Sequence, residues 1–123
     1  MKNIEKANEL FEQAWNEMHN YNFDKAIELL IEADCLGHDE ALCYAGYSYQ
    51  FIKGDIKAAI DLYTKAIDRG SANAKFLLGN CYYEGIGVEQ NTLKGCKLRN
   101  EALREGSGLA HRWFLKITDQ FPK

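Results

Sequence analysis

Proline is nearly absent from this chain, and long apolar runs are absent altogether. The one proline in 123 residues is Pro122, so no proline interrupts helices in the body of the chain. Crossing a bilayer takes about 20 consecutive apolar residues, and charged residues interrupt every stretch before that length. Residues 1–15 carry charges every few positions and lack the apolar centre of a secretory signal. If the chain begins at its natural start, we expect a cytoplasmic protein that does not bind membranes.

Metal-binding and catalytic spacings are missing as well. The four cysteines lie 8, 38 and 15 residues apart, with no C-x-x-C pair: Cys35, Cys43, Cys81 and Cys96. These intervals match no zinc pattern, and the three histidines are scattered along the chain. No nucleophile pairs recognisably with a histidine base, and catalysis would also need a dry pocket. We therefore predict no metal, no cofactor and no enzymatic activity, and we expect most of the cysteines to pack as small apolar side chains.

Charge is distributed unevenly along the chain. Residues 1–62 hold 12 Asp and Glu against 5 Lys and Arg, whereas residues 63–123 hold 6 against 10. Two interpretations stay open: chance variation on solvated helix faces, or a dipolar molecule that favours an oriented partner. Glu101 and Glu105 interrupt the basic half, whereas a nucleic-acid surface would carry a dense basic stripe. We predict no binding to nucleic acid.

The chain repeats itself with a period of one helical hairpin. Glycine recurs at Gly37, Gly70 and Gly106, which lie 33 and 36 residues apart. A period of this length is typical of solenoids built from helix–turn–helix units, in which each unit buries its apolar face against its neighbours. We predict an all-α, right-handed α/α solenoid that forms a single domain, 1–123, with repeats at about 7–37, 41–70 and 74–106 and a capping helix at about 108–119.

Small residues inside the predicted helices indicate close helix crossings. Glycine in a helix interior costs about 1 kcal/mol relative to alanine, so Gly46 and Gly79 suggest positions where a partner helix comes near. Ala26, Ala59 and Gly95 lie at the matching point of the partner helices, eleven residues before each closing glycine. A side chain larger than a methyl group at these positions would push the paired helices apart.

Capping residues mark where several helices are expected to begin. Asn22 is expected to cap a helix from Phe23, and Ser71 or Asn73 is expected to cap the helix over about 72–84. The first helix of the second repeat is predicted to run from Asp39 to about Lys53.

The third repeat carries the most specific motif. Its residues follow the order A-x3-LG-x2-Y-x2-GxGV…K…G at Ala74, Leu78, Gly79, Tyr82, Gly85, Gly87, Val88, Lys94 and Gly106. This order resembles the Sel1-like repeat family, a relative of the tetratricopeptide repeats. The family usually has alanine where Gly95 stands. The second repeat lacks GxGV and looks closer to a tetratricopeptide repeat, and the resemblance as a whole covers residues 7–117.

The resemblance implies a protein–protein interaction scaffold or adaptor that binds a peptide, a loop or a folded partner on its concave face. One alternative is a dedicated inhibitor of one partner, such as a toxin-neutralising immunity protein. Some secreted bacterial members carry cysteine pairs eight residues apart and are linked to penicillin-like compounds, so a penicillin-binding or hydrolysing enzyme is a third hypothesis. Cys35 and Cys43 are eight apart. We expect free thiols in a cytosolic protein, and a disulfide between these two stays open.

In solenoids of this kind the first helix of each repeat lines the concave face. If Ala14, Gly46, Gly79 and Leu115 are equivalent packing points, neighbouring positions give a partner-binding set of eleven residues: Phe11, Trp15, Met18, Cys43, Tyr47, Gln50, Phe76, Asn80, Tyr83, Arg112 and Lys116. Clustered exposed aromatic residues usually mark interaction sites. The alternative is an aromatic stripe that belongs to the core, with Tyr49 and Tyr82 expected there in any case.

Overall fold

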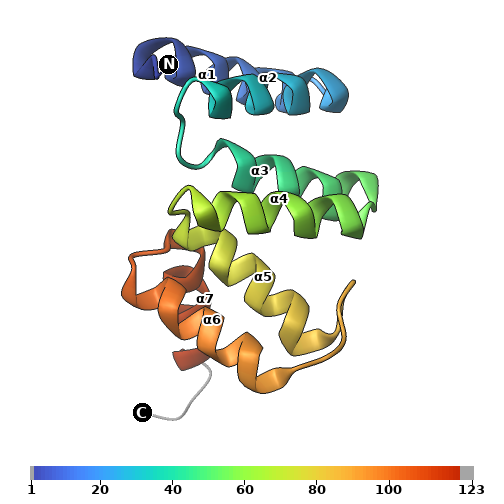
Figure 1. Ribbon diagram of the computed structural model, residues 1–123, viewed down its shortest axis with the longest axis vertical. Coiled ribbons are helices and arrows are strands. Elements are labelled where there is room, and N and C mark those ends of the chain that lie inside the picture. Colours follow the sequence, from blue (N-terminus) through green and yellow to red (C-terminus); the bar gives the residue numbers. More distant parts are fainter. Residues whose placement is uncertain (1, 120–123) are drawn as a thin grey trace. The chain divides into compact units, whose positions relative to one another are not determined.

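The computed structural model describes residues 2–119, which form seven α-helices and one π-helix and contain no strand (Figure 1). The elements are α1 (Ile4–His19), α2 (Phe23–Cys35), α3 (Ala41–Ser48), the π-helix η1 (Tyr49–Lys53), α4 (Ile56–Asp68), α5 (Ala72–Glu84), α6 (Thr92–Arg104) and α7 (Gly108–Thr118). The prediction of an all-α chain is confirmed. The right-handed sense stays a prediction.

The chain divides into two compact units, which are described separately. Unit 1 ends at Gly70 and contains α1 to α4 with η1, whereas unit 2 begins at Ser71 and contains α5 to α7. Within unit 1, α1 packs on α2, α2 on α3, and α3 on α4; within unit 2, α5 packs on α6, and α7 contacts both (Figure 1). The prediction of one domain over residues 1–123 stays a prediction.

The three repeating glycines end helices as their spacing predicts. Gly37, Gly70 and Gly106 have φ angles of 104°, 91° and 87°, a left-handed backbone that other residues rarely adopt. Of the predicted caps, Ser71 accepts a hydrogen bond from the backbone N–H of Ala74 at 3.1 Å. Asn22 stands at the N-cap position of α2 as expected, but its side chain makes no capping bond and instead donates to the carboxylate of Glu17.

The core of unit 1 is built from aliphatic and small side chains. One cluster of buried residues joins α1, α2 and α3: Leu10, Ala14, Leu29, Leu30, Ala33, Ala41 and Ala45. The next crossing depends on Gly46, where a Cβ atom would lie 2.7 Å from the ring of Tyr63. Tyr63 is fully buried, whereas Tyr49, expected in the core, is only half-buried. The buried aromatic ring at this crossing therefore comes from α4.

The first helix of the second repeat does not remain α-helical to Lys53. It changes to the π-helix η1 at Tyr49 and ends at Gly54, whose φ is 72°. A π-helical turn is wider than an α-helical turn. The segment of five residues is too short for its pattern of apolar residues to distinguish the two kinds of helix. The hydroxyl of Tyr63 donates to Oε1 of Gln50 at 2.6 Å and ties η1 to α4. The side chains of Phe51 and Ile52 lie exposed.

Unit 2 is organised around a very close crossing of α5 and α6. A Cβ atom at Gly79 would lie 3.0 Å from the carbonyl oxygen of Gly95, and one at Gly95 would lie 2.7 Å from the carbonyl oxygen of Gly79. The two backbones therefore approach each other as the sequence predicts. Helix α7 follows, with Ala110 buried against the hairpin.

Candidate protein-binding surfaces

Unit 1 presents two sets of aromatic rings, one on α1 and α3 (Phe11, Trp15 and Tyr44) and one on α3 and η1 (Tyr47 and Phe51), which we together call the aromatic surface. The ring of Tyr44 on α3 lies 5.5 Å from both Phe11 and Trp15 on α1, and Tyr47 lies 4.6 Å from Phe51. Three of the five are substantially exposed: Trp15 at 44%, Tyr47 at 42% and Phe51 at 58%. Large rings left this open to water are available to a partner.

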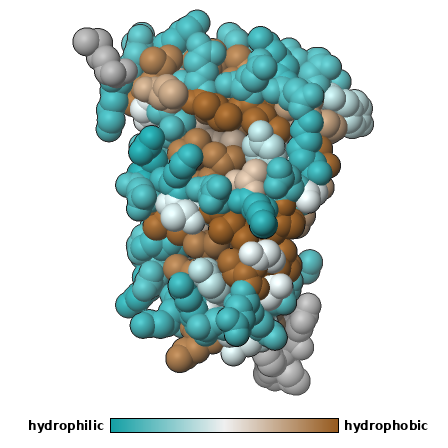
Figure 2. All heavy atoms as spheres, turned by 45° about the vertical axis from the view of Figure 1, so that its right-hand side comes forward, coloured by the Kyte–Doolittle hydropathy of each residue, from teal (hydrophilic) through white to brown (hydrophobic). Residues whose placement is uncertain are grey.

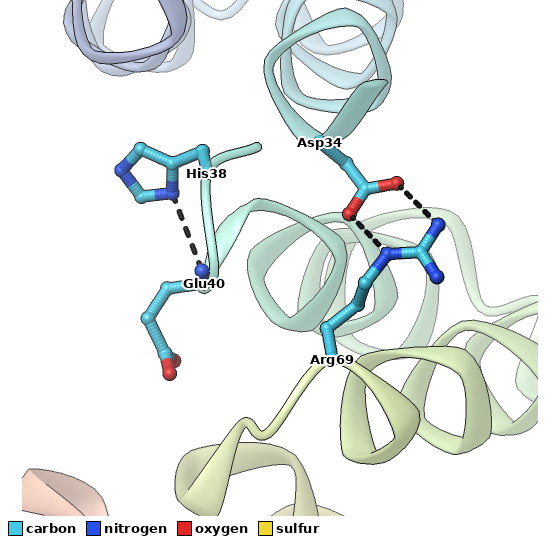
Figure 3. Close-up of polar contacts among 4 residues, drawn as sticks. All are labelled: Asp34, His38, Glu40 and Arg69. Carbon is cyan, nitrogen blue, oxygen red and sulfur yellow. Dashed lines mark hydrogen bonds and ion pairs between the residues drawn. The ribbon is translucent and has the colours of Figure 1, made fainter. Parts of the chain in front are cut away.

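His38 supports this surface from the turn between α2 and α3. Its ring stacks on Phe11, with centroids 4.1 Å apart and planes 14° from parallel. The backbone N–H of Glu40 donates to its Nδ1 at 3.2 Å (Figure 3). Burial lowers the pKa of His38, opposed by the carboxylates of Asp39 and Glu40, which raise it. Since Nδ1 accepts a hydrogen bond, the neutral ring is the form that fits here.

A hollow of about 420 Å³ lies beside the same turn. It is lined by Lys2, Asp34, Cys35, Gly37, His38, Asp39, Asp68 and Arg69. Arg69 donates from Nε and Nη2 to the two carboxylate oxygens of Asp34 at 3.2 and 3.3 Å (Figure 3). These hydrogen bonds, and then the charge of Asp34, raise the pKa of Arg69. Asp34 and Arg69 thus pair with each other and bridge α2 to the end of α4.

The part of the chain that the structure describes has no side-chain cluster suited to binding a metal ion. Between residues 2 and 119, no three His, Cys, Asp or Glu side chains are grouped so that they could hold a metal ion. The exposed rings make the aromatic surface the stronger candidate for function.

Unit 2 holds a second group of side chains, which we call the Arg99 cluster: Asn80 and Tyr83 from α5, Arg99 from α6, and Trp113 from α7. The guanidinium of Arg99 lies 4.1 Å from the ring centre of Tyr83 and 4.9 Å from that of Trp113. Its Nε donates to Oδ1 of Asn80 at 2.7 Å. Cation–π contacts and this hydrogen bond hold the guanidinium in place.

The structure exposes part of the predicted partner-binding set. Exposed members are Trp15, Tyr47, Tyr83, Arg112 and Lys116, and half-buried members are Phe11, Met18, Gln50 and Asn80. Figure 2 shows hydrophobic side chains at the surface, gathered in patches between hydrophilic ones. That these residues bind a partner stays a prediction.

Two members of the set are not available to a partner, and the expectation that they line an open face is wrong. Cys43 is 1% exposed and Phe76 is 7% exposed. Helix α3 is covered by both α2 and α4, so six of its eight residues are buried. Phe76 packs on Trp113 of α7, with ring centres 5.9 Å apart. Neighbouring helices therefore cover positions that periodicity alone left open.

Other residues were missed by the sequence analysis. Tyr44 and Phe51 lie three residues before and four after Tyr47, a helical spacing that could have placed them on the same side of the helix. Arg99 lies four residues after Gly95, the residue at the α5–α6 crossing, and that position could have suggested its contact with α5. His38 carries no local signal, because its stacking on Phe11 joins residues 27 positions apart.

Paired helices that end at left-handed glycines and cross at small residues define a helical-repeat protein. The chain belongs to the Sel1 repeat family, since the family's model matches residues 1–14, 39–71 and 72–107. The crystal structure of a Sel1 repeat protein from Oxalobacter formigenes has a similar fold, with a TM-score of 0.74 and 22% identity over 85% of this chain. This chain covers 45% of that protein's length. No curated protein matches the sequence.

Sel1 repeats commonly form scaffolds for protein–protein interactions, and the family is not typically catalytic. Among the helices of residues 2–119, none combines the length and apolar character needed to span a bilayer.

Proposed function

We propose that this protein binds another protein or a peptide through the aromatic surface of unit 1 and works as an adaptor. The observation that carries the proposal is the exposure of Trp15 on α1, Tyr47 on α3 and Phe51 on η1. Burying apolar area contributes about 25 cal/mol per Å², and Trp and Tyr are frequent anchors of interfaces. Rings fixed by their neighbours also lose little entropy when they bind.

We propose that the aromatic surface belongs to the concave face of the repeats and that the protein acts in the cytoplasm. Family membership supports a scaffold role without naming a partner. An adaptor would recover several proteins from its own cells, whereas a dedicated inhibitor would recover one.

Affinity capture with matched variants tests the proposal. The double variant Trp15→Ala/Tyr47→Ala removes two exposed rings of the aromatic surface. The control, Ile31→Ala/Leu93→Ala, removes two apolar side chains that are 41% and 74% exposed on α2 and α6. We expect the control variant to capture the same proteins as the unaltered chain and the double variant to capture none of them. Both variants should keep the circular dichroism spectrum of the unaltered chain. Equal retention or equal loss by both variants would show that another surface carries binding.

A further inference from the structure

Arg99 is held in a fixed position by three elements of unit 2. Asn80 on α5 accepts the N–H of Nε at 2.7 Å, while Tyr83 and Trp113 lie 4.1 and 4.9 Å from the guanidinium. The backbone of Arg99 also lies at the close crossing, because a Cβ atom at Gly79 would be 3.2 Å from its amide nitrogen. The side chain is half-buried, and Tyr83 is 39% exposed. The cation is therefore partly desolvated yet reachable from solvent.

The charge of Arg99 is not paired with a carboxylate among residues 2–119. Lys75, on the same hairpin, shows the contrast, since it pairs with Glu101 at 3.6 Å and Glu105 at 2.7 Å. Arg99 forms no such ion pair within the described residues. Its hydrogen bond to Asn80 uses Nε, and its two terminal nitrogens make no hydrogen bond to another described residue. A planar guanidinium matches the two oxygens of a carboxylate.

The charge balance of unit 2 favours an acidic ligand. Residues 71–123 hold 8 Lys and Arg against 5 Asp and Glu. Arg112 and Lys116 are exposed on α7, one helical turn apart and on either side of Trp113 in the sequence. A net positive field raises the association rate of negatively charged segments.

We propose that the Arg99 cluster binds a carboxylate side chain, from Asp or Glu, of an acidic segment in a partner protein. The terminal nitrogens of Arg99 donate to both carboxylate oxygens, and the rings of Tyr83 and Trp113 hold the guanidinium in the orientation that this contact needs. The Arg99 cluster lies wholly within unit 2, and its binding does not require the aromatic surface of unit 1 to bind anything.

The test uses the full chain and a fluorescent octaglutamate peptide with an amidated C-terminus. Binding is followed by fluorescence anisotropy at low ionic strength. Arg99→Gln removes the guanidinium, Arg99→Lys keeps the charge without the fork, and Arg104→Gln on α6 is the control with the same change in net charge. We expect Arg99→Gln to weaken binding about tenfold or more, Arg99→Lys to weaken it severalfold, and Arg104→Gln to change it by less than about twofold.

Several results would overturn the proposal. Equal weakening by Arg99→Gln and Arg104→Gln would mean diffuse attraction, and binding only of the peptide with a free C-terminus would mean capture of the α-carboxylate. No binding of either peptide to the unaltered chain would also overturn it. A measurement independent of any variant is the NMR signal of the Arg99 Nε–H group, which we expect to shift as octaglutamate is added. An unmoved signal in the presence of bound peptide would place the contact elsewhere.

Discussion

Gly95 sets the distance between α5 and α6. A Cβ atom there would lie 2.7 Å from both the carbonyl oxygen of Gly79 and the amide nitrogen of Tyr83. Both are backbone atoms, so no side chain can rotate away to make room. Glycine, which has no Cβ atom, is the residue that this close approach accommodates. The same approach brings Asn80 and Tyr83 to Arg99.

We expect Gly95→Ala to destabilise the protein, although alanine favours helix by about 1 kcal/mol. Overpacking against backbone costs about 1–3 kcal/mol, which exceeds the gain in helix propensity at the upper end of that range. Thermal denaturation measures the change. Gly108→Ala is the control, because nothing lies within 4 Å of a Cβ at Gly108, and there we expect no loss or a gain of about 0.4–1 kcal/mol. Equal stability of the two variants would show that the crossing tolerates a methyl group.

His38 makes the stability of unit 1 depend on pH near neutrality. Burial lowers its pKa below the ordinary value of 6.5, so the unfolded chain binds the proton more readily than the folded one. The stabilisation that comes from the neutral His38 ring is therefore fully present above the pKa that His38 has in the unfolded chain. This stabilisation is lost as the pH decreases toward the lower pKa of His38 in the folded protein. Protonation would also put a proton on Nδ1, which accepts the N–H of Glu40.

The prediction is that the free energy of unfolding decreases between about pH 7.5 and pH 5.5, and that His38→Gln reduces this decrease. Urea denaturation at several pH values measures it. His19→Gln is the control, since His19 is exposed on α1 and its Nδ1 contacts only the carbonyl oxygen of Trp15 within the described residues. If His38→Gln retains the full dependence on pH, another group is responsible.

At the scale of elements, α7 is joined to α5 through a buried polar contact. Ser107 is 3% exposed, and its hydroxyl accepts the N–H of Ala110 at 3.0 Å. The same hydroxyl donates to Oδ1 of Asn73 at 2.6 Å, and that oxygen also accepts the N–H of Leu109 at 3.3 Å. A cap and a tertiary hydrogen bond thus share one side chain. Since α7 supplies Trp113, this contact also supports the Arg99 cluster.

We expect Ser107→Ala to cost about 1–2 kcal/mol, because it removes a helix cap and leaves Asn73 with one donor fewer. Hydrogen exchange followed by mass spectrometry should show that Ser107→Ala speeds amide exchange in α7 more than in α5, relative to the unaltered protein. The control is Asn91→Ala, which removes the exposed cap of α6 at Lys94 and should cost about 0.5 kcal/mol. A smaller effect of Ser107→Ala than of Asn91→Ala would contradict the role given to the buried contact.

At the scale of the whole molecule, the four cysteines differ in exposure to solvent, and this difference can be measured by their reactivity. No disulfide joins these four cysteines, which all lie among the described residues; Cys35 and Cys96 are exposed, and Cys43 and Cys81 are buried. Burial, with a smaller effect from Glu84, raises the pKa of Cys81. A thiol that stays protonated reacts slowly, since the thiolate is the nucleophile.

The prediction is that iodoacetamide modifies Cys35 and Cys96 in the folded protein and all four cysteines after unfolding. Peptide mass spectrometry identifies the modified positions. Unreduced protein should show no mass loss from a bridge, and a disulfide between Cys35 and Cys43 would contradict the expectation of free thiols. Rapid modification of Cys81 in the folded state would contradict its burial.

Local patterns in the sequence gave correct information about helices and crossings. Gly37, Gly70 and Gly106 end helices because a left-handed backbone is a property of the residue itself. Gly46 and Gly79 lie at crossings because small size matters at any close approach. Tyr49–Lys53 differs, since the pattern predicts continued α-helix and the chain forms a π-helix tied by Tyr63.

By itself, the sequence determined an all-α chain of hairpins that belongs to the Sel1 repeat family. Turn residues, helical periodicity and residue size are local features of the sequence. They can be recognised without knowing which distant segments pack together. Only the tertiary structure decided which side of each helix stays open. Cys43 and Phe76 are buried by other helices, and Arg99 lies between Tyr83 and Trp113. These outcomes depend on contacts between distant segments, which no local pattern encodes.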